Sequence, residues 1–127
     1  MEKNDKQLPD LSKPEYDILR ILWKKGQKSA REIHEYLLAT HGWALTTTRT
    51  VIDRMVKKKL LEKQNNHGIF IFKPLISRPT GLAKIVKFFA ERVLETDTNS
   101  VVSMFSNNTG ITEKELDELR NILNKEE

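Results

Sequence analysis

The chain of 127 residues contains no cysteine, and this absence excludes disulfide bonds, thiolate metal sites and cysteine nucleophiles together. It also has no run of about 18 or more uncharged apolar residues, so we expect no helix that spans a membrane. The first seven residues, M-E-K-N-D-K-Q, are polar and of mixed charge, unlike a secretory signal or a transit peptide. These features lead us to expect a cytoplasmic protein that does not bind a membrane.

The sequence also lacks the residue patterns of an enzyme. Its histidines, His34, His41 and His67, are scattered, and no Ser or Asp stands in a nucleophile motif. No glycine-rich loop that could cradle a phosphate is present. We therefore expect no catalytic activity, no cofactor and no metal site.

Positive charge is concentrated in one part of the chain. Residues 8–76 contain 13 Lys and Arg against 7 Asp and Glu, whereas residues 77–127 contain 7 against 9. A basic domain attracts polyanions through counterion release, although the same excess also suits a membrane surface or no partner at all.

Two capping-box patterns predict the first two helices. Ser12 and Glu15 precede a wide apolar arc over residues 16–23, so the first helix is expected to be largely buried. Ser29 and Glu32 repeat the pattern and predict a second helix that ends near residues 41–42.

A third helix is predicted over residues 45–59, L-T-T-T-R-T-V-I-D-R-M-V-K-K-K, with Thr46 or Thr47 as its N-cap. At 100° per residue its apolar side chains share one side and its polar side chains share the other. Short hydroxyls fit against a backbone or a thymine methyl, guanidinium forks can bind guanine O6 and N7, and ammonium groups suit phosphates. Such a helix could enter a DNA major groove, although a merely solvated helix face has the same pattern. The polar side consists of Thr46, Arg49, Thr50, Asp53, Arg54 and Lys57.

Two short strand-like segments follow, residues 60–64 and 69–73, separated by the turn formers N-N-H-G. Three helices and a hairpin are the order of a winged helix-turn-helix, in which helix three enters the major groove and the hairpin tip reaches the flanking backbone or minor groove. We predict a mainly α fold with a small β-hairpin: a winged-helix DNA-binding domain at 8–76 and an all-α dimerisation domain at 77–127. The predicted DNA-binding residues are Thr46, Arg49, Thr50, Arg54, Lys57, Lys58, Lys63 and His67.

The C-terminal part contains further amphipathic helices, the last opened by a capping-box pattern at residues 112–115. Helices of this size cannot bury their apolar stripes alone, so they either fold back on the first domain or pair with a second copy. We favour pairing, because helix-turn-helix proteins usually recognise half-sites related by two-fold symmetry. The predicted dimer contacts are Leu82, Ile85, Val86, Phe89, Val93, Leu116, Leu119, Ile122 and Leu123.

Three segments resemble the penicillinase and methicillin-resistance repressors: S-K-P-E-Y-D-I-L-R-I-L-W from residue 12, T-T-T-R-T-V-I-D-R-M-V-K-K-K-L-L from residue 46, and I-T-E-K-E-L-D-E-L-R-N-I-L-N-K from residue 111. The resemblance implies a homodimer that binds a palindromic operator in double-stranded DNA and represses transcription of β-lactamase or related genes. It further implies that Thr47, Arg49, Thr50 and Arg54 serve the DNA contact. Two departures affect operator preference: Thr46 stands where the relatives often have Lys, and Asp53 would repel a facing phosphate.

The same resemblance implies inactivation by a cut in the dimerisation domain, made by a sensor protease. The relatives are cut at an Asn-Phe bond within S-L-V-L-N-F, and the matching stretch here, S-V-V-S-M-F, places the bond at Met104–Phe105. The apolar frame is kept but the Asn is not. On spacing alone, Val101, Met104 and Phe105 are expected to belong to a core.

Other functions remain open at the level of sequence. A winged helix can serve as a protein-interaction module, a repressor of this type can control unrelated genes, and a nonspecific architectural DNA protein would show the same basic helix.

Overall fold

The structure, a computed structural model, describes residues 8–104 and 110–126 of the chain. Its contacts divide it into two compact units: a winged unit, Leu11–Ser77, and a helical unit of residues 8–10 and 78–126. The sequence pattern assigns residues 8–10 to the first domain, but Leu8 packs on the core of the helical unit. The division into a DNA-binding and a dimerisation domain stays a prediction.

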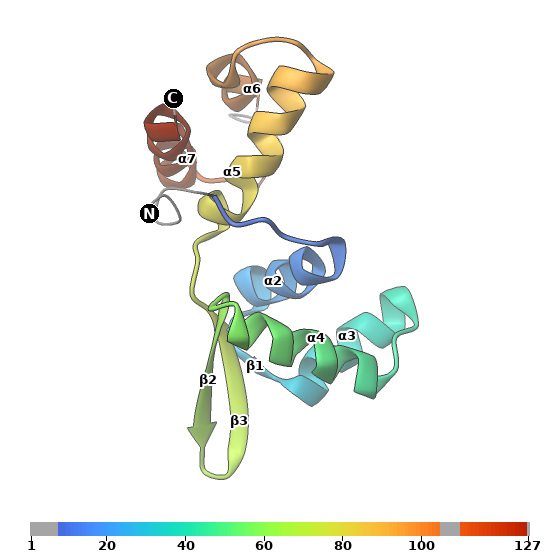
Figure 1. The fold of residues 1–127 in the computed structure, drawn as a ribbon. Coiled ribbons are helices and arrows are strands. Elements are labelled where there is room, and N and C mark those ends of the chain that lie inside the picture. The colour runs from blue at the N-terminus through green and yellow to red at the C-terminus, as the bar shows by residue number, and fades with distance from the viewer. Residues whose placement is uncertain (1–7, 105–109, 127) are drawn as a thin grey trace. The chain divides into compact units, whose positions relative to one another are not determined.

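Three helices form the body of the winged unit: α2 (Lys13–Lys25), α3 (Ala30–His41) and α4 (Leu45–Lys57) (Figure 1). The two predicted capping boxes are confirmed. The Ser12 and Ser29 hydroxyls each accept a hydrogen bond from the backbone amide of the glutamate three residues later, and the carboxylate of that glutamate accepts one from the serine amide. The three helices enclose one apolar core, built from Ile18, Leu19, Leu22, Ala30, Ile33, Leu37, Val51, Ile52, Met55, Leu60, Leu61 and Phe72.

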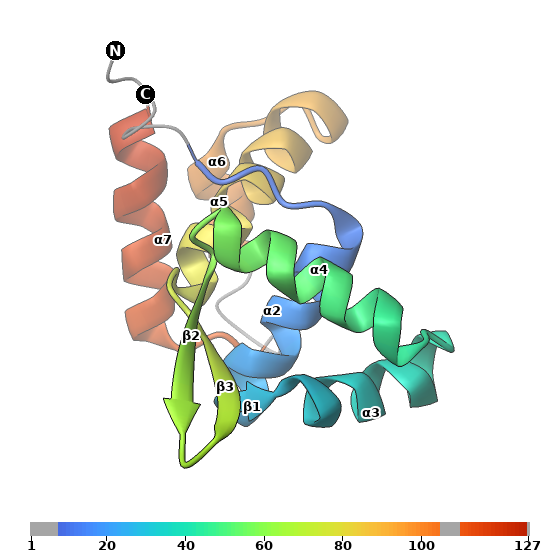
Figure 2. The same cartoon turned by 60° about the horizontal axis from the view of Figure 1, so that its bottom comes forward.

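The predicted hairpin is present as β2 (Leu61–Asn66) and β3 (Ile69–Pro74). A third strand, β1 (Lys28–Ser29), was not predicted; it pairs antiparallel with β3, so that the order is β1-β3-β2. A strand of two residues leaves no periodicity to detect. Figures 1 and 2 both show the hairpin extending beyond the three helices.

The hairpin reverses over two residues, His67 and Gly68, between the paired residues Asn66 and Ile69. Both have positive φ, 55° and 87°, as a type I′ turn requires. The Asn65 side-chain oxygen accepts a hydrogen bond of 2.8 Å from the Gly68 amide. The hairpin of β2 and β3 is the wing of the fold, and this tight turn fixes the conformation of its tip.

The turn from α4 into β2 depends on a lysine in a left-handed conformation. Lys59 has a φ of 64°, its amide donates to the Val56 carbonyl, and the Leu60 amide donates to the Met55 carbonyl at 2.9 Å. This is a Schellman motif, whose left-handed position normally carries glycine. Leu60 and Met55, which the motif brings together, are both buried in the core.

The helical unit contains α5 (Arg78–Phe88), the π-helix η1 (Phe89–Val93), α6 (Thr98–Met104) and α7 (Glu113–Glu126). The wider turn of η1 is visible in the bond from the Leu94 amide to the Phe89 carbonyl, five residues back, at 2.9 Å. The core of this unit consists of Ala83, Val86, Ala90, Val101, Val102, Leu116, Leu119 and Leu123.

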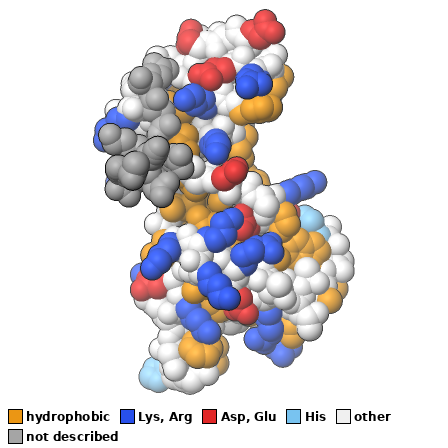
Figure 3. Space-filling view, in the orientation of Figure 1, with side chains coloured by type: hydrophobic (Ala, Val, Ile, Leu, Met, Phe, Trp, Pro, Cys, Tyr) orange, Lys and Arg blue, Asp and Glu red, His pale blue; other side chains and the backbone are white. Residues whose placement is uncertain are grey.

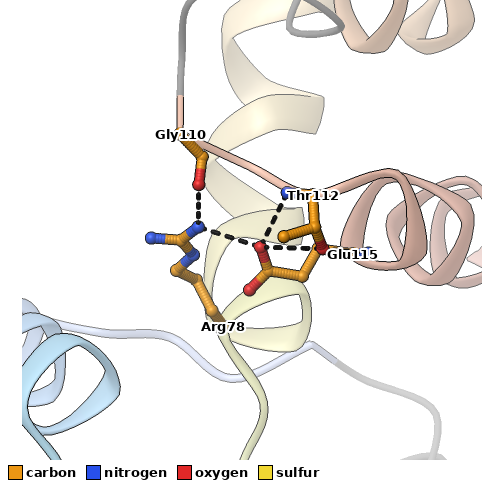
Figure 4. Close-up of polar contacts among 4 residues, drawn as sticks. All are labelled: Arg78, Gly110, Thr112 and Glu115. Carbon is orange, nitrogen blue, oxygen red and sulfur yellow. Dashed lines mark hydrogen bonds and ion pairs between the residues drawn. The ribbon is translucent and has the colours of Figure 1, made fainter.

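An arginine joins the start of α5 to the start of α7 (Figure 4). Arg78 Nη2 donates to the Gly110 carbonyl oxygen and to Glu115 Oε1, both at 2.9 Å. Glu115 and Thr112 form the third predicted capping box, with bonds of 3.0 and 3.1 Å between each backbone amide and the other side chain. One carboxylate thus both caps α7 and fastens it to α5.

We predict that Lys59→Gly stabilises the winged unit by about 1 kcal/mol. A non-glycine residue in the left-handed region costs on the order of 1–3 kcal/mol, and the greater freedom of glycine in the unfolded chain cancels part of the gain. The matched control is Arg49→Gly, at an exposed position inside α4, which should instead destabilise by about 1 kcal/mol. Urea denaturation of the wild type and the two variants measures both changes. A loss of stability in Lys59→Gly would show that the left-handed backbone of Lys59 is not strained.

Candidate nucleic-acid interface

Helix α4 has one buried and one exposed side, as predicted. Thr48, Val51, Ile52 and Met55 are buried. In the winged unit of Figure 3, Lys and Arg side chains gather on the face that carries α4. Seven of the nine residues predicted to contact DNA are exposed on α4 and its C-cap, with Asp53 among them: Thr46, Thr47, Arg49, Thr50, Arg54, Lys57 and Lys58.

The predicted N-cap of α4 was wrong. The helix begins at Leu45, its N-cap is Ala44, and no side chain caps it. The threonine hydroxyls bond backwards instead: Thr48 Oγ1 donates to the Ala44 carbonyl at 3.3 Å, and Thr50 Oγ1 donates to the Thr46 carbonyl at 2.9 Å. The first amides of α4 therefore have no side-chain acceptor, and together with the helix dipole they favour an anion.

A buried carboxylate lies beneath the C-terminal half of α4. Glu15 is only 1% exposed, and its Oε1 accepts the Ser12 amide at 2.9 Å. Its Oε2 accepts Lys58 Nζ at 2.7 Å and lies 3.7 Å from Arg54 Nε. Two of the predicted DNA-binding cations therefore share one acidic partner in α2.

The sequence pattern predicts Glu15 as a cap but does not predict these ion pairs. A signal was present, because Glu15 precedes Ile18 and Leu19 by three and four residues and so lies on the buried side of α2. A carboxylate on a buried side needs a cation or several donors. Nothing in the sequence says which cations supply them.

The surroundings of Glu15 act on its pKa in opposite directions. Burial raises the pKa, whereas the Lys58 ammonium and the hydrogen bonds from Ser12 lower it, and the net result is a pKa below the ordinary value of 4.5. The carboxylate is therefore ionised at neutral pH and holds its two cations as a charged group.

The wing carries the other two predicted DNA-binding residues. Lys63 on β2 is exposed, and its ammonium lies 4.2 Å from the ring centroid of Phe70 on β3. His67 is exposed in the two-residue turn. The Phe70 ring supports the lysine, so the cation is held at the surface of the hairpin.

The residues predicted to form the dimer contact divide into an exposed group and a group in or against the core of the helical unit. Ile85, Phe89 and Val93 are exposed, together with Phe88 and Leu94. The other six face their own subunit: Val86, Leu116, Leu119 and Leu123 are buried in the core of the helical unit, and Leu82 and Ile122 pack against it.

The expectation that Met104 belongs to a core was wrong. Its side chain is 65% exposed at the end of α6, whereas Val101, Val102 and Thr98 are buried. Met104 is the last residue of α6 and points outward, so its spacing of three residues from the buried Val101 does not predict its burial. Phe105, the other half of the candidate cleavage bond, lies outside the described residues.

Within the described residues, no group of three or more His, Cys, Asp or Glu side chains is arranged to hold a metal ion. His41 contacts Asp17 of α2, with 3.2 Å between Nε2 and Oδ2. No helix in residues 8–104 or 110–126 has both the length and the apolar character to cross a bilayer.

Comparisons with known proteins point in one direction. The sequence model of the family described as "Penicillinase repressor" matches residues 11–125. The methicillin resistance regulatory protein MecI of Mammaliicoccus sciuri is 31% identical over 121 residues, 95% of this chain and 98% of the relative. The penicillinase repressor of Staphylococcus aureus is 30% identical over 115 residues, 91% of each chain. The solution structure of the DNA binding domain of the repressor BlaI matches with a TM-score of 0.51 and 25% identity, covering 57% of this chain and 88% of that one.

Three helices, a small antiparallel sheet and a protruding hairpin define a winged-helix fold, the fold of the BlaI DNA-binding domain. The predicted fold class is thereby confirmed. The chain belongs to the penicillinase repressor family, which is a family of transcriptional repressors and not a class of enzymes.

We predict that the stabilisation due to the Glu15 charge is lost in acid. Because the pKa of Glu15 is lowered on folding, its charge stabilises the protein above the ordinary pKa of 4.5, and this contribution disappears as pH falls through the folded pKa. The difference in unfolding free energy between wild type and Glu15→Gln should therefore shrink between pH 7 and pH ~3. Denaturant titrations at several pH values measure it, and a difference independent of pH would contradict the lowered pKa.

Proposed function

We propose that this protein is a homodimeric repressor that binds a palindromic operator in double-stranded DNA. The observation that carries the proposal is the exposed side of α4, where hydroxyl, guanidinium and ammonium groups project from a helix whose other side is fixed in the core. Arg49 and Thr50 are suited to base edges, and Lys57 to phosphate. The membership of the family supports this function, and a DNA-binding repressor would act in the cytoplasm, where the DNA of a bacterium lies.

The wing has a separate part in the proposal. Lys63 and His67 are exposed on a hairpin that extends beyond the helices, so they would reach the DNA backbone or minor groove beside the site of α4. The amides at the start of α4 would receive a phosphate, since they have no side-chain cap.

The dimer would form through the exposed apolar side of α5 and η1. Ile85, Phe88, Phe89, Val93 and Leu94 are each between 42% and 59% exposed and follow one another at helical spacing. A contiguous apolar surface of this kind marks an interaction site, and a two-fold axis would place it against itself. This set replaces the predicted contacts that face their own core.

The names of the relatives support a proposal for the regulated genes and for the way the repressor is inactivated. The related proteins are named as regulators of methicillin resistance and of penicillinase, so we propose that this repressor controls β-lactamase or related genes. Cleavage by a sensor protease would fall at Met104–Phe105. The exposed Met104 side chain supports access to the first residue of that bond.

We predict that Arg49→Ala weakens operator binding by about 1–3 kcal/mol, the usual contribution of a specific base contact. The control is Lys114→Ala, which removes one exposed positive charge from α7 in the helical unit. Gel shifts on a palindrome that the wild-type protein selects from random duplexes measure the loss. Equal binding by wild type and Arg49→Ala would rule out α4 as the reading helix.

We predict that Ile85→Glu shifts the protein from dimer to monomer at micromolar concentration, because a buried, unpaired carboxylate at a subunit contact is costly. Asn121→Glu, which adds the same charge to an exposed position of α7, should leave the dimer intact. Sedimentation equilibrium distinguishes the two. If Ile85→Glu remained dimeric, the contact would have to lie elsewhere.

A further inference from the structure

Two cations that face the proposed DNA site are also bound to the protein itself. Glu15 Oε2 accepts Lys58 Nζ at 2.7 Å and lies 3.7 Å from Arg54 Nε. The carboxylate is 1% exposed, whereas the Arg54 and Lys58 side chains are 51% and 44% exposed. The pairs therefore lie at the surface of α4, where the same cations could instead reach a phosphate.

Capping does not explain why this residue carries a charge. A capping box needs only a side-chain oxygen at its third position, and glutamine supplies one. Glu32 occupies the same position of the same motif at the start of α3, and its side chain accepts only from Ser29, at 2.8 Å, among the interactions described. Glu15 differs from Glu32 because its carboxylate also contacts Arg54 and Lys58, at the C-terminal end of α4.

We infer that Glu15 is a positioning residue that sets the DNA sequence specificity of this protein. It withholds Lys58 from general phosphate binding and fixes the direction of the Arg54 guanidinium on α4. The inference rests on the proposed DNA binding and adds to it the residue that limits binding to the wrong sequences.

The physical basis is a competition between two anions. A lysine that contacts phosphate increases affinity for every sequence alike, because the backbone carries no direct sequence information. An internal carboxylate that already neutralises the lysine reduces this general affinity, while base contacts by Arg49 are unaffected. Because this reduction applies to every duplex, the withdrawal of Lys58 alone leaves the ratio of specific to nonspecific affinity unchanged. The ratio is higher with the carboxylate because Glu15 Oε2, 3.7 Å from Arg54 Nε, holds the guanidinium in one direction, which suits one arrangement of base edges rather than any phosphate.

The test compares Glu15→Gln with Glu32→Gln in the full-length protein. Both variants keep the cap oxygen and both raise the net charge by one, but only Glu15→Gln removes the partner of Lys58 and Arg54. The two probes are a palindromic duplex selected by the wild-type protein and a shuffled duplex of the same composition. Fluorescence anisotropy over a range of salt concentrations gives the affinities, and circular dichroism verifies that both variants are folded.

For Glu15→Gln we expect tighter binding to the shuffled duplex and a several-fold lower specificity ratio. The salt dependence should become steeper by roughly 0.9 for each further phosphate that a subunit neutralises. Glu32→Gln should match wild type in the ratio. Equal changes in the two variants would reduce the effect to net charge and overturn the inference, as would an unchanged ratio in Glu15→Gln.

A third substitution, Lys58→Gln, tests whether Glu15 acts through Lys58. If the carboxylate acts through Lys58, the increase in nonspecific affinity from Glu15→Gln should be absent when Lys58 is already Gln; an increase that persists would overturn this role. A wild-type protein that selects no duplex from the random pool would contradict the proposed function and the inference together. A wild-type protein that prefers its palindrome, beside a Glu15→Gln variant with the same preference, would contradict the inference alone.

Discussion

The winged unit depends on the single buried carboxylate of Glu15. One oxygen completes the cap of α2 and the other binds the C-terminal end of α4, so a local helix signal and a tertiary contact meet in one side chain. Removing such a charge from water is costly unless the carboxylate is hydrogen-bonded and paired with positive charge. Here the Ser12 amide and the Lys58 ammonium donate hydrogen bonds to it, and Arg54 Nε lies 3.7 Å away as a second positive charge. The orientation of α4 is thereby coupled to the point where α2 begins.

The helical unit uses the same arrangement without a fully buried group. Glu115 caps α7 and accepts from Arg78 at the start of α5, so the two helices are joined where they begin. Their leucines and alanines then fill a core that α5 and α7 share within one subunit. The larger apolar residues of α5 and η1 remain outside this core, so the same segment that completes the fold of its own unit also offers the surface that we propose for dimerisation.

Much of this architecture could be predicted from the sequence, because its signals are local. The capping boxes, the 3.6-residue period of α4 and the turn formers before Gly68 each act over a few residues. What could not be predicted depends on distant partners: the two-residue strand β1, the pairing of Glu15 with Lys58, and the side of α7 that its own subunit buries. Leu116 and Leu119 show the limit, since periodicity identifies an apolar stripe but not what covers it. The cap of α4 was missed because threonine hydroxyls compete between caps and backward bonds.

The open start of α4 has a consequence for the energetics of recognition. A side-chain cap would contribute about 0.5–2 kcal/mol to the isolated protein, and the Ala44 terminus gives up most of that contribution. The same amides gain an acceptor only when an anion lies against them. The N-terminal turn of α4 would then be the least stable part of this helix in the free protein and would become ordered on the duplex. Part of the folding of this protein would thus be completed by DNA binding.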